Sequence, residues 1–222
     1  LIIAASFAKG KTILRNCAIE PEIGDLINFL RKMGCNIKWS GKRTITIIGV
    51  KTLQETKYKI MFDRIEAGTY MIASALTAGN IKIINIIPKI IKTEIDILRK
   101  VGASIKTKDA ELRIIGRNKI NNIKIITSPY PGFPTDLQAQ LMVLLCRAFG
   151  RSEIIEKIFE NRFMHASELN RMGAKIKIFG NRAIIEGNVN FKAAELMATD
   201  LRASVSLILA ALAAKGKSII NR

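Results

Sequence analysis

The sequence has 222 residues, 49% of them hydrophobic, and a formal net charge of +18 at pH 7. This length and apolar content suffice for one large domain, or for parts of two, with a sizeable core. The longest apolar run, residues 203–214, is too short to cross a bilayer, and the opening LIIAASFAKG lacks the basic leader and cleavage pattern of a signal peptide. We therefore expect neither a membrane-spanning nor a secreted protein.

The positive charge leaves the class of partner open. Lys and Arg number 36 against 18 Asp and Glu, but they are scattered along the chain, and aromatic residues make up only 6%. No basic stripe or stacking platform of the kind that nucleic-acid-binding proteins use stands out. We interpret the charge as compositional, or as an aid to binding small anionic substrates, and keep a basic nucleic-acid-binding module as a less favoured alternative.

In chain order, a helix rich in small residues ends at a glycine and is followed by a β-rich run, and this happens repeatedly. The phrases SFAKG, ALTAG, CRAFG and LAAKG end at Gly10, Gly79, Gly150 and Gly216. After the first three, an amphipathic helix ends in a phrase such as FLRKMG, and two strands joined by a polar turn follow. The glycines are expected to be left-handed helix caps. The spacing of about 70 residues indicates a repeated supersecondary unit.

Each unit is predicted to run helix, strand, helix, strand, strand, which gives an α/β protein. Some of the helices are apolar on almost every face: EAGTYMIASALTA (66–78), LQAQLMVLLCRA (137–148) and LRASVSLILAALAA (201–214). A helix that is apolar all round must be buried. We expect a pseudo-threefold arrangement in which these helices, beginning at Arg64, Thr135 and Thr199, form the interior while the sheets lie outside.

Each of these helices opens with charged or capping residues. The groups are Asp63–Arg64, Thr135–Asp136, and Thr199–Asp200 followed by Arg202. If the helices share one axis, their starts converge, and helix N–H groups together with Arg suit phosphate or carboxylate groups. The alternative is that the acids only cap their helices and the arginines pair with them.

The stretch YPGFPTDLQAQ, residues 130–140, is predicted to be a stiff loop that leads into a buried helix, because prolines and a glycine cluster at its start. Pro134 disfavours the helical region for Phe133, so Thr135 or Asp136 is the expected N-cap. A carboxylate held at the mouth of a helix could also take a proton from a substrate hydroxyl. Spacing alone leaves both roles of Asp136 open.

The cysteines Cys17, Cys35 and Cys146 show neither disulfide nor metal-site spacing, and we interpret them as reduced thiols of a cytoplasmic protein, with Cys146 in the core. No metal or organic cofactor is suggested. The single histidine, His165, is interpreted as a packing residue.

Long phrases along the chain point to one family. They are DRIEAGTYMIASAL (63–76), PGFPTDLQAQ (131–140), IFENRFMHASELNRMGA (158–174) and MATDLRAS (197–204). The sequence resembles, over its whole length, the UDP-N-acetylglucosamine 1-carboxyvinyltransferases, a group of enolpyruvyl transferases. The resemblance implies an inside-out α/β barrel fold of two similar domains, each of three repeated units. Residues 1–61 would be the last unit of the N-terminal domain, and residues 62–222 most of the C-terminal domain.

The resemblance also implies a reaction. The family transfers the enolpyruvyl group of phosphoenolpyruvate to the 3′-hydroxyl of UDP-N-acetylglucosamine and releases phosphate, which is the first committed step of peptidoglycan synthesis. By motif, Asp136 would be the base that contacts this hydroxyl, and Ile158 and Phe159 would contact the nucleotide sugar. Arg162 would be the cation for the carboxylate or phosphate, since its planar fork matches such groups.

Asp200 and Leu201, in ATDLRA, would lie near the reacting atoms, with Asp200 orienting or shuttling a proton. Other features of the family are not found: an N-terminal Lys-Asn pair, a loop Cys, and an Arg motif expected shortly after Arg222. The chain would then cover roughly the second half of the enzyme, and its N-terminal half would be the missing partner. We expect no turnover by the chain alone, so phosphate release from phosphoenolpyruvate would contradict this expectation. A catalytically inactive remnant that binds nucleotide sugars is the second alternative.

Overall fold

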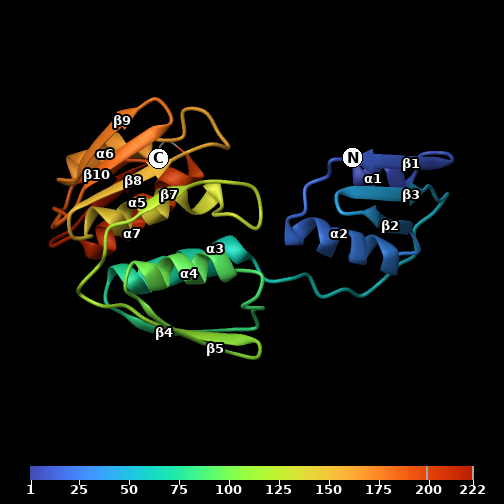
Figure 1. Cartoon of the computed structure of the whole chain (residues 1–222), viewed down its shortest axis with the longest axis horizontal. Coiled ribbons are helices and arrows are strands. Elements are labelled where there is room, and N and C mark those ends of the chain that lie inside the picture. Colours follow the sequence, from blue (N-terminus) through green and yellow to red (C-terminus); the bar gives the residue numbers. More distant parts are fainter. Residues whose placement is uncertain (199, 222) are drawn as a thin grey trace. The chain divides into compact units, whose positions relative to one another are not determined.

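The chain folds into two compact units, Leu1–Phe62 and Asp63–Arg222, as drawn in Figure 1. The computed structural model describes residues 1–198 and 200–221. The sequence-based boundary lies after residue 61. That the units correspond to parts of an N-terminal and a C-terminal domain stays a prediction. Among the described residues, no helix is long and apolar enough to span a membrane.

The first unit is a single repeat. Its elements are α1 (Ile2–Ser6), β1 (Lys11–Arg15), α2 (Pro21–Lys32), β2 (Asn36–Gly41) and β3 (Thr44–Ile48). The sheet has the order β1-β3-β2, and both strand pairs are antiparallel. Helix α2 begins with a proline and has basic residues in its last turn, and both features favour a helix with that direction. Its apolar side packs on the sheet and buries Ile27, Leu30, Ile37, Ile45 and Ile47.

The second unit contains further repeats of the same kind. One comprises α3 (Arg64–Leu76), β4 (Asn80–Ile84), α4 (Lys92–Lys100), β5 (Ser104–Lys108) and β6 (Glu111–Ile115). The next comprises the 3-10 turn η1 (Thr135–Leu137), α5 (Gln138–Cys146), β8 (Arg151–Ile155), α6 (His165–Arg171), β9 (Lys175–Phe179) and β10 (Arg182–Glu186). Two short strands lie between repeats: β7 (Lys124–Ile126) before the repeat of α5, and β11 (Glu195–Met197) before that of α7. The last repeat begins with α7 (Leu201–Ala213) and β12 (Ile219–Asn221). The predicted order of helix, strand, helix, strand and strand is confirmed in each complete repeat, whereas β7 and β11 were not predicted.

The sheets repeat the topology of the first unit. The orders β4-β6-β5 and β8-β10-β9 are antiparallel and match β1-β3-β2, with the last strand of each repeat in the middle. Strand β7 extends the second of these sheets by pairing parallel to β8, and β11 pairs parallel to β12.

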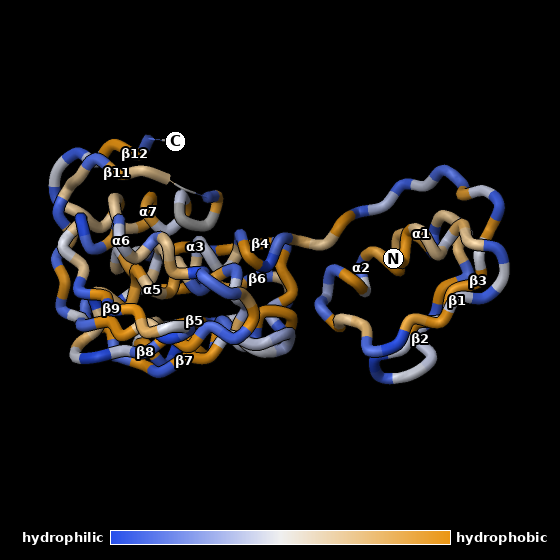
Figure 2. The backbone as a smooth tube through the Cα atoms, turned by 90° about the horizontal axis from the view of Figure 1, so that it is seen from above, coloured by the Kyte–Doolittle hydropathy of each residue, from blue (hydrophilic) through white to orange (hydrophobic). Residues whose placement is uncertain are grey.

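The helices of the second unit lie inside and its strands toward the periphery (Figure 2). All 9 residues of α5 are buried. Helix α5 contacts both α3 and α7, and these two also contact each other. The predicted arrangement of buried helices and outer sheets is confirmed, most fully for α5, because a helix without a polar face can only be accommodated where protein surrounds it. Helix α7 is less enclosed than predicted, since Ile208 and Leu212 remain 49% and 63% exposed.

The glycine caps are confirmed at three helices. Gly34, Gly102 and Gly173 end α2, α4 and α6 with positive φ angles of 98°, 110° and 93°. Gly10, Gly150 and Gly216 also have positive φ angles (87°, 80° and 97°), but they lie three or four residues beyond the last residue of α1, α5 and α7 and do not cap them.

After α3, however, the left-handed residue is Ala78 (φ 52°) and not the predicted Gly79. The Gly79 N–H instead donates to the Ser74 carbonyl at 2.8 Å, as the residue after the left-handed position does in a Schellman cap.

A glycine follows the last strand of every complete repeat and lies against the chain at the end of that repeat's first helix. Its N–H donates to the carbonyl of the residue before the first strand, in the pairs Gly49–Gly10 (3.0 Å), Gly116–Gly79 (2.8 Å) and Gly187–Gly150 (2.9 Å). A Cβ atom at these glycines would lie 1.7, 2.2 or 1.8 Å from the carbonyl oxygen of Ala8, Ser74 or Ala148, respectively. Strand and helix therefore approach each other as closely as backbone atoms allow.

This close approach can be tested in the first unit. We expect Gly49→Ala to destabilise the unit by about 1–3 kcal/mol or more, because the added methyl group overlaps a backbone oxygen that cannot move aside cheaply. The measurement is urea unfolding followed by the fluorescence of Trp39, the single tryptophan, which lies in β2 of the same unit.

Gly24→Ala is the matched control. Gly24 lies within α2, and a Cβ there would meet nothing within 4 Å, so this variant is expected to gain up to about 1 kcal/mol from helix propensity. Equal unfolding midpoints for the two variants would contradict the role given to Gly49.

Candidate active site

The loop before α5 is held by backbone contacts. Phe133 is buried and pairs as an isolated parallel bridge with Thr127, and its carbonyl accepts a hydrogen bond of 3.0 Å from the Ser128 N–H. The Tyr130–Pro131 peptide bond is cis. The predicted loop is therefore present, and it delivers the chain to the turn η1 at the start of α5.

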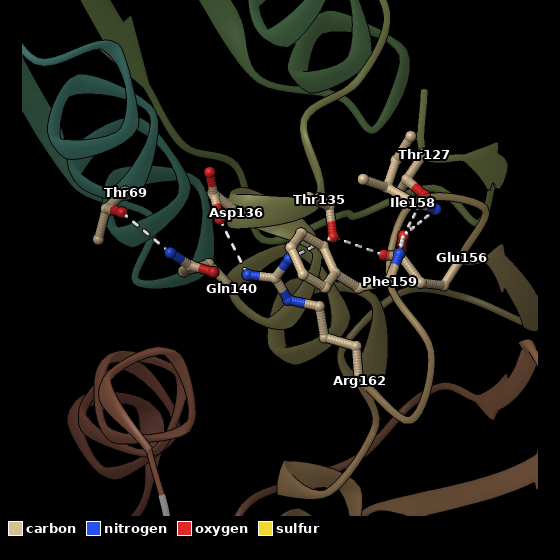
Figure 3. A network of polar contacts seen from close by, with 9 residues as sticks. All are labelled: Thr69, Thr127, Thr135, Asp136, Gln140, Glu156, Ile158, Phe159 and Arg162. Atoms are coloured by element: carbon tan, nitrogen blue, oxygen red, sulfur yellow. Dashed lines mark hydrogen bonds and ion pairs between the residues drawn. The ribbon is translucent and has the colours of Figure 1, made fainter. Parts of the chain in front are cut away.

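The predicted N-cap at Thr135 or Asp136 is wrong. The N-cap of η1 is Pro134 and that of α5 is Leu137, and neither of these described positions makes a side-chain capping hydrogen bond. The reason is that a 3-10 turn separates the loop from the α-helix, so both predicted residues lie inside the turn. Their side chains are engaged by side chains from another segment (Figure 3).

An acidic N-cap is present at α3. This agrees with the alternative that the acids at the helix starts cap their helices. Asp63 Oδ1 accepts hydrogen bonds from the N–H groups of Ile65 (2.7 Å) and Glu66 (3.1 Å). Arg64 is buried and forms an ion pair of 3.8 Å with Glu94 of α4. Asp63 therefore orders the start of α3, while Arg64 joins α3 to its neighbouring helix.

Asp136 and Arg162, both predicted from the sequence, are in direct contact. Arg162 Nη2 donates to Asp136 Oδ1 at 2.9 Å, and Nη1 donates to Thr135 Oγ1 at 2.9 Å. The guanidinium carbon lies 4.6 Å from the centre of the Phe159 ring. The Arg162 side chain is only 12% exposed, against 35% for Asp136. A cation fixed on several sides therefore holds a carboxylate that solvent can still reach (Figure 3).

Glu156 organises the same region, and sequence reasoning missed it. Its residue is 2% exposed, and its carboxylate accepts hydrogen bonds from Thr127 Oγ1 (2.7 Å), Thr135 Oγ1 (2.8 Å) and the N–H groups of Ile158 (2.7 Å) and Phe159 (3.1 Å). The only signal in the sequence is a glutamate that directly follows an apolar strand. That pattern does not distinguish a buried acid from an exposed one.

The members of the Asp136–Arg162 pair line two different cavities. One, of about 570 Å³, is lined by residues that include Lys157, Ile158, Phe159, Arg162 and Asn181. The other, of about 420 Å³, is lined by residues that include Asp63, Glu66, Tyr70, Asp136, Gln140 and Leu201. The second cavity brings together residues from the starts of α3, α5 and α7, as expected for helices that share one centre. The described residues contain no group of three or more His, Cys, Asp or Glu that could hold a metal ion.

The remaining predicted residues lie at the start of α7. Leu201 is 78% exposed and shares the cavity of Asp136. The Asp200 carbonyl accepts from the N–H (2.9 Å) and Oγ (2.8 Å) of Ser204, so Asp200 begins the helix. Thr199 and the side chain of Arg202, which were also predicted to contribute, lie outside the described residues.

The cysteines have no features of a nucleophile. Cys35 and Cys146 are buried, as expected for Cys146, and burial raises the pKa of the Cys146 thiol to about 12. Cys17 is partly buried, and its thiol donates to the Leu14 carbonyl at 3.3 Å. A thiol that is reactive needs a lowered pKa.

His165 is buried at the start of α6, as expected of a packing residue. Burial lowers the pKa of His165 from 6.5 to about 4, although the nearby charge of Asp200 acts in the opposite direction. Within the described part of the chain, its Nε2 atom has no hydrogen-bond partner. The imidazole is therefore neutral at pH 7.

The titration of His165 is directly measurable, because it is the only histidine of the chain. We expect its imidazole NMR signals to titrate near pH 4. Because the pKa is lower in the folded than in the unfolded state, stability is complete above pH 6.5 and falls as the pH drops toward 4. The loss would reach about 2 kcal/mol at pH 5. His165→Gln should remove this part of the pH dependence, and a titration midpoint near 6.5 would contradict it.

The comparison with known proteins decides the family. The sequence profile of EPSP synthase (3-phosphoshikimate 1-carboxyvinyltransferase) matches residues 1–222. The chain belongs to the EPSP synthase family. Among its curated relatives, the UDP-N-acetylglucosamine 1-carboxyvinyltransferase of Pelagibacter ubique is 72% identical over 222 residues, which are 100% of this chain and 53% of the relative. Enzyme 1 of that name from Caldanaerobacter subterraneus subsp. tengcongensis is 50% identical over 221 residues, again 100% of this chain and 53% of the relative.

These matches confirm the resemblance seen in the motifs of this family member. The chain spans about half the length of the curated relatives it matches. The enolpyruvyl transferase NikO from Streptomyces tendae, a solved structure, has a TM-score of 0.89 at 26% identity, with 98% of this chain and 52% of that one covered. EPSP synthase from Acinetobacter baumannii has a TM-score of 0.74 at 21% identity, covering 99% of this chain and 54% of that one, and supports the fold.

Proposed function

We propose that the protein transfers the enolpyruvyl group of phosphoenolpyruvate to the 3′-hydroxyl of UDP-N-acetylglucosamine and releases phosphate. The observation that carries this proposal is the Asp136–Arg162 pair, whose Oδ1 and Nη2 atoms are 2.9 Å apart and whose members line different cavities. The names of the relatives support the choice of the acceptor sugar.

The chemistry requires a base and a cation. A C–O bond forms between the sugar oxygen and the enolpyruvyl carbon, the C–O bond to phosphate breaks, and the hydroxyl proton must leave. Asp136 is the proposed base, because its carboxylate is fixed in direction and still accessible from a cavity. Arg162 orients Asp136 and offers positive charge to the carboxylate or phosphate of phosphoenolpyruvate. The proton finally leaves with phosphate.

The linings of the cavities suit different parts of the substrates. The cavity that contains Asp136 also has the carboxylates of Asp63 and Glu66 and the amide of Gln140, and such acceptors suit the hydroxyl groups of a sugar. The cavity that contains Arg162 also has Lys157, beside the acids Glu156 and Glu160, and its two cations suit phosphate groups. The Asp136–Arg162 pair would then stand where a sugar hydroxyl meets an anionic donor.

The residues of the two other predicted motifs receive narrower roles. Ile158 and Phe159 are 39% and 58% exposed, and their N–H groups already donate to Glu156, so their side chains and carbonyls would contact the nucleotide sugar. At the start of α7, Leu201 would pack against the sugar in the cavity of Asp136, and Asp200 would orient or shuttle a proton. The protein would work in the cytoplasm, in peptidoglycan synthesis, on these small molecules and without a cofactor, a nucleic acid or a membrane.

The test places this chain in a full-length enzyme. It replaces the matching segment of the Pelagibacter ubique relative, to which it is 72% identical. The chimera should release phosphate from phosphoenolpyruvate only when UDP-N-acetylglucosamine is present. Asp136→Asn should lower kcat by about 100- to 10,000-fold, because an amide cannot accept the hydroxyl proton.

Asp109→Asn is the control, since Asp109 lies in an exposed turn between β5 and β6 and should leave turnover unchanged. Near-normal turnover of the Asp136 variant would remove Asp136 from the role of base. An inactive chimera whose chain still binds UDP-N-acetylglucosamine would favour a binding remnant over an enzyme.

A further inference from the structure

Glu156 is a buried acid whose two carboxylate oxygens serve different segments. Oε1 accepts from Thr127 Oγ1 at 2.7 Å and from the N–H groups of Ile158 and Phe159 at 2.7 and 3.1 Å. Oε2 accepts from Thr135 Oγ1 at 2.8 Å. One oxygen therefore shapes the 157–162 loop, and the other reaches the turn that carries Asp136 (Figure 3).

The position of this carboxylate is fixed by its own backbone as well. The Glu156 N–H donates to the Asn181 carbonyl at 2.8 Å, and the Glu156 carbonyl accepts from Asn181 Nδ2 at 3.1 Å. A buried carboxylate is costly unless donors satisfy it, and here three donors contact Oε1 and one contacts Oε2. A group held by four donors is rigid and can serve as a reference point for its neighbours.

A chain of hydrogen bonds leads from Glu156 to the reacting groups. The single hydroxyl proton of Thr135 is directed to Glu156 Oε2, so the Thr135 oxygen presents its lone pairs to Arg162 and accepts from Nη1 at 2.9 Å. The other terminal nitrogen of the same guanidinium, Nη2, donates to Asp136 Oδ1 at 2.9 Å. Because the guanidinium can only donate and Glu156 can only accept from Thr135, the Thr135 hydroxyl is held between them in one orientation.

We propose that Glu156 is a positioning residue of the transfer reaction, which orients Arg162, and through it Asp136, by way of the Thr135 hydroxyl. The inference rests on the proposed function, since it assigns Glu156 to the same site. Glu156 does not touch the substrates in this proposal. It keeps the base and the cation in register with the loop that contacts the nucleotide sugar, and a misplacement of about 1 Å at such a site can cost about 100-fold in rate.

The two oxygens can be separated by substitution in the chimeric enzyme described above. Glu156→Gln keeps one oxygen for the donors from Thr127, Ile158 and Phe159, but replaces the Oε2 atom by an NH₂ group that cannot accept the Thr135 proton. Thr135→Val removes the hydroxyl while keeping the shape, and Thr135→Ser keeps the hydroxyl as the conservative rescue.

We expect Glu156→Gln and Thr135→Val each to lower kcat by about 10- to 100-fold, with a small change in the KM for UDP-N-acetylglucosamine. Thr135→Ser should stay within about threefold of the unsubstituted chimera, because the relay survives. The double variant, Glu156→Gln with Thr135→Val, should be no slower than either single variant, because both break the same link. A structural role would instead give additive losses that follow the loss of folded protein.

Amide hydrogen exchange gives a readout that does not depend on activity. In the chain itself, the amides of Ile158 and Phe159 should keep their protection in Glu156→Gln and lose it in Glu156→Ala, because only glutamine retains the acceptor. Unchanged kcat in Glu156→Gln, or additive effects in the double variant, would overturn the positioning role. An unsubstituted chimera without turnover would instead count against the proposed function, while the exchange result would still decide the placement of Glu156.

Discussion

The second unit is built around α5, a helix with no polar, solvent-exposed face. All 9 residues of α5 are buried, so other helices and sheets must enclose it on every side. Because α3 and α7 contact α5 and each other, the starts of the helices come together at one end of the unit. The cavity that contains Asp136, Asp63 and Leu201 lies among these starts. The hydrophobic effect therefore places polar groups side by side that are far apart in the sequence.

The polar side of the site is organised differently, by hydrogen bonds between charged and polar side chains. Arg162 comes from the loop after β8 and Asp136 from the turn before α5, and neither segment is a regular helix or strand at that point. Side-chain hydrogen bonds hold these segments in place, as backbone hydrogen bonds hold helices and strands elsewhere. The carboxylate of the buried Glu156 accepts several of them. A rigid core thus supports a site built on loops, as is common in enzymes.

The sequence revealed what periodicity and motif can encode. The order of elements and the buried helices followed from hydrophobic pattern, and resemblance singled out Asp136 and Arg162, although their contact with each other was not predicted. The prediction of the N-cap before α5 was wrong, because the sequence does not distinguish a Thr or Asp that caps a helix from one that binds another side chain. Sequence reasoning also missed Glu156, whose partners lie as far as 29 residues away. Hydrogen bonds between distant segments leave no period in a sequence.

The glycines after β3, β6 and β10 bear on how such a chain can change over evolutionary time. They let the strand and the helix of each repeat meet through backbone atoms, which are the same whatever the neighbouring side chains are. The spacing between strand and helix therefore does not depend on which side chains the neighbouring positions carry. Duplicated units can diverge in almost every side chain and still be superimposable, provided that this one residue stays without a Cβ atom.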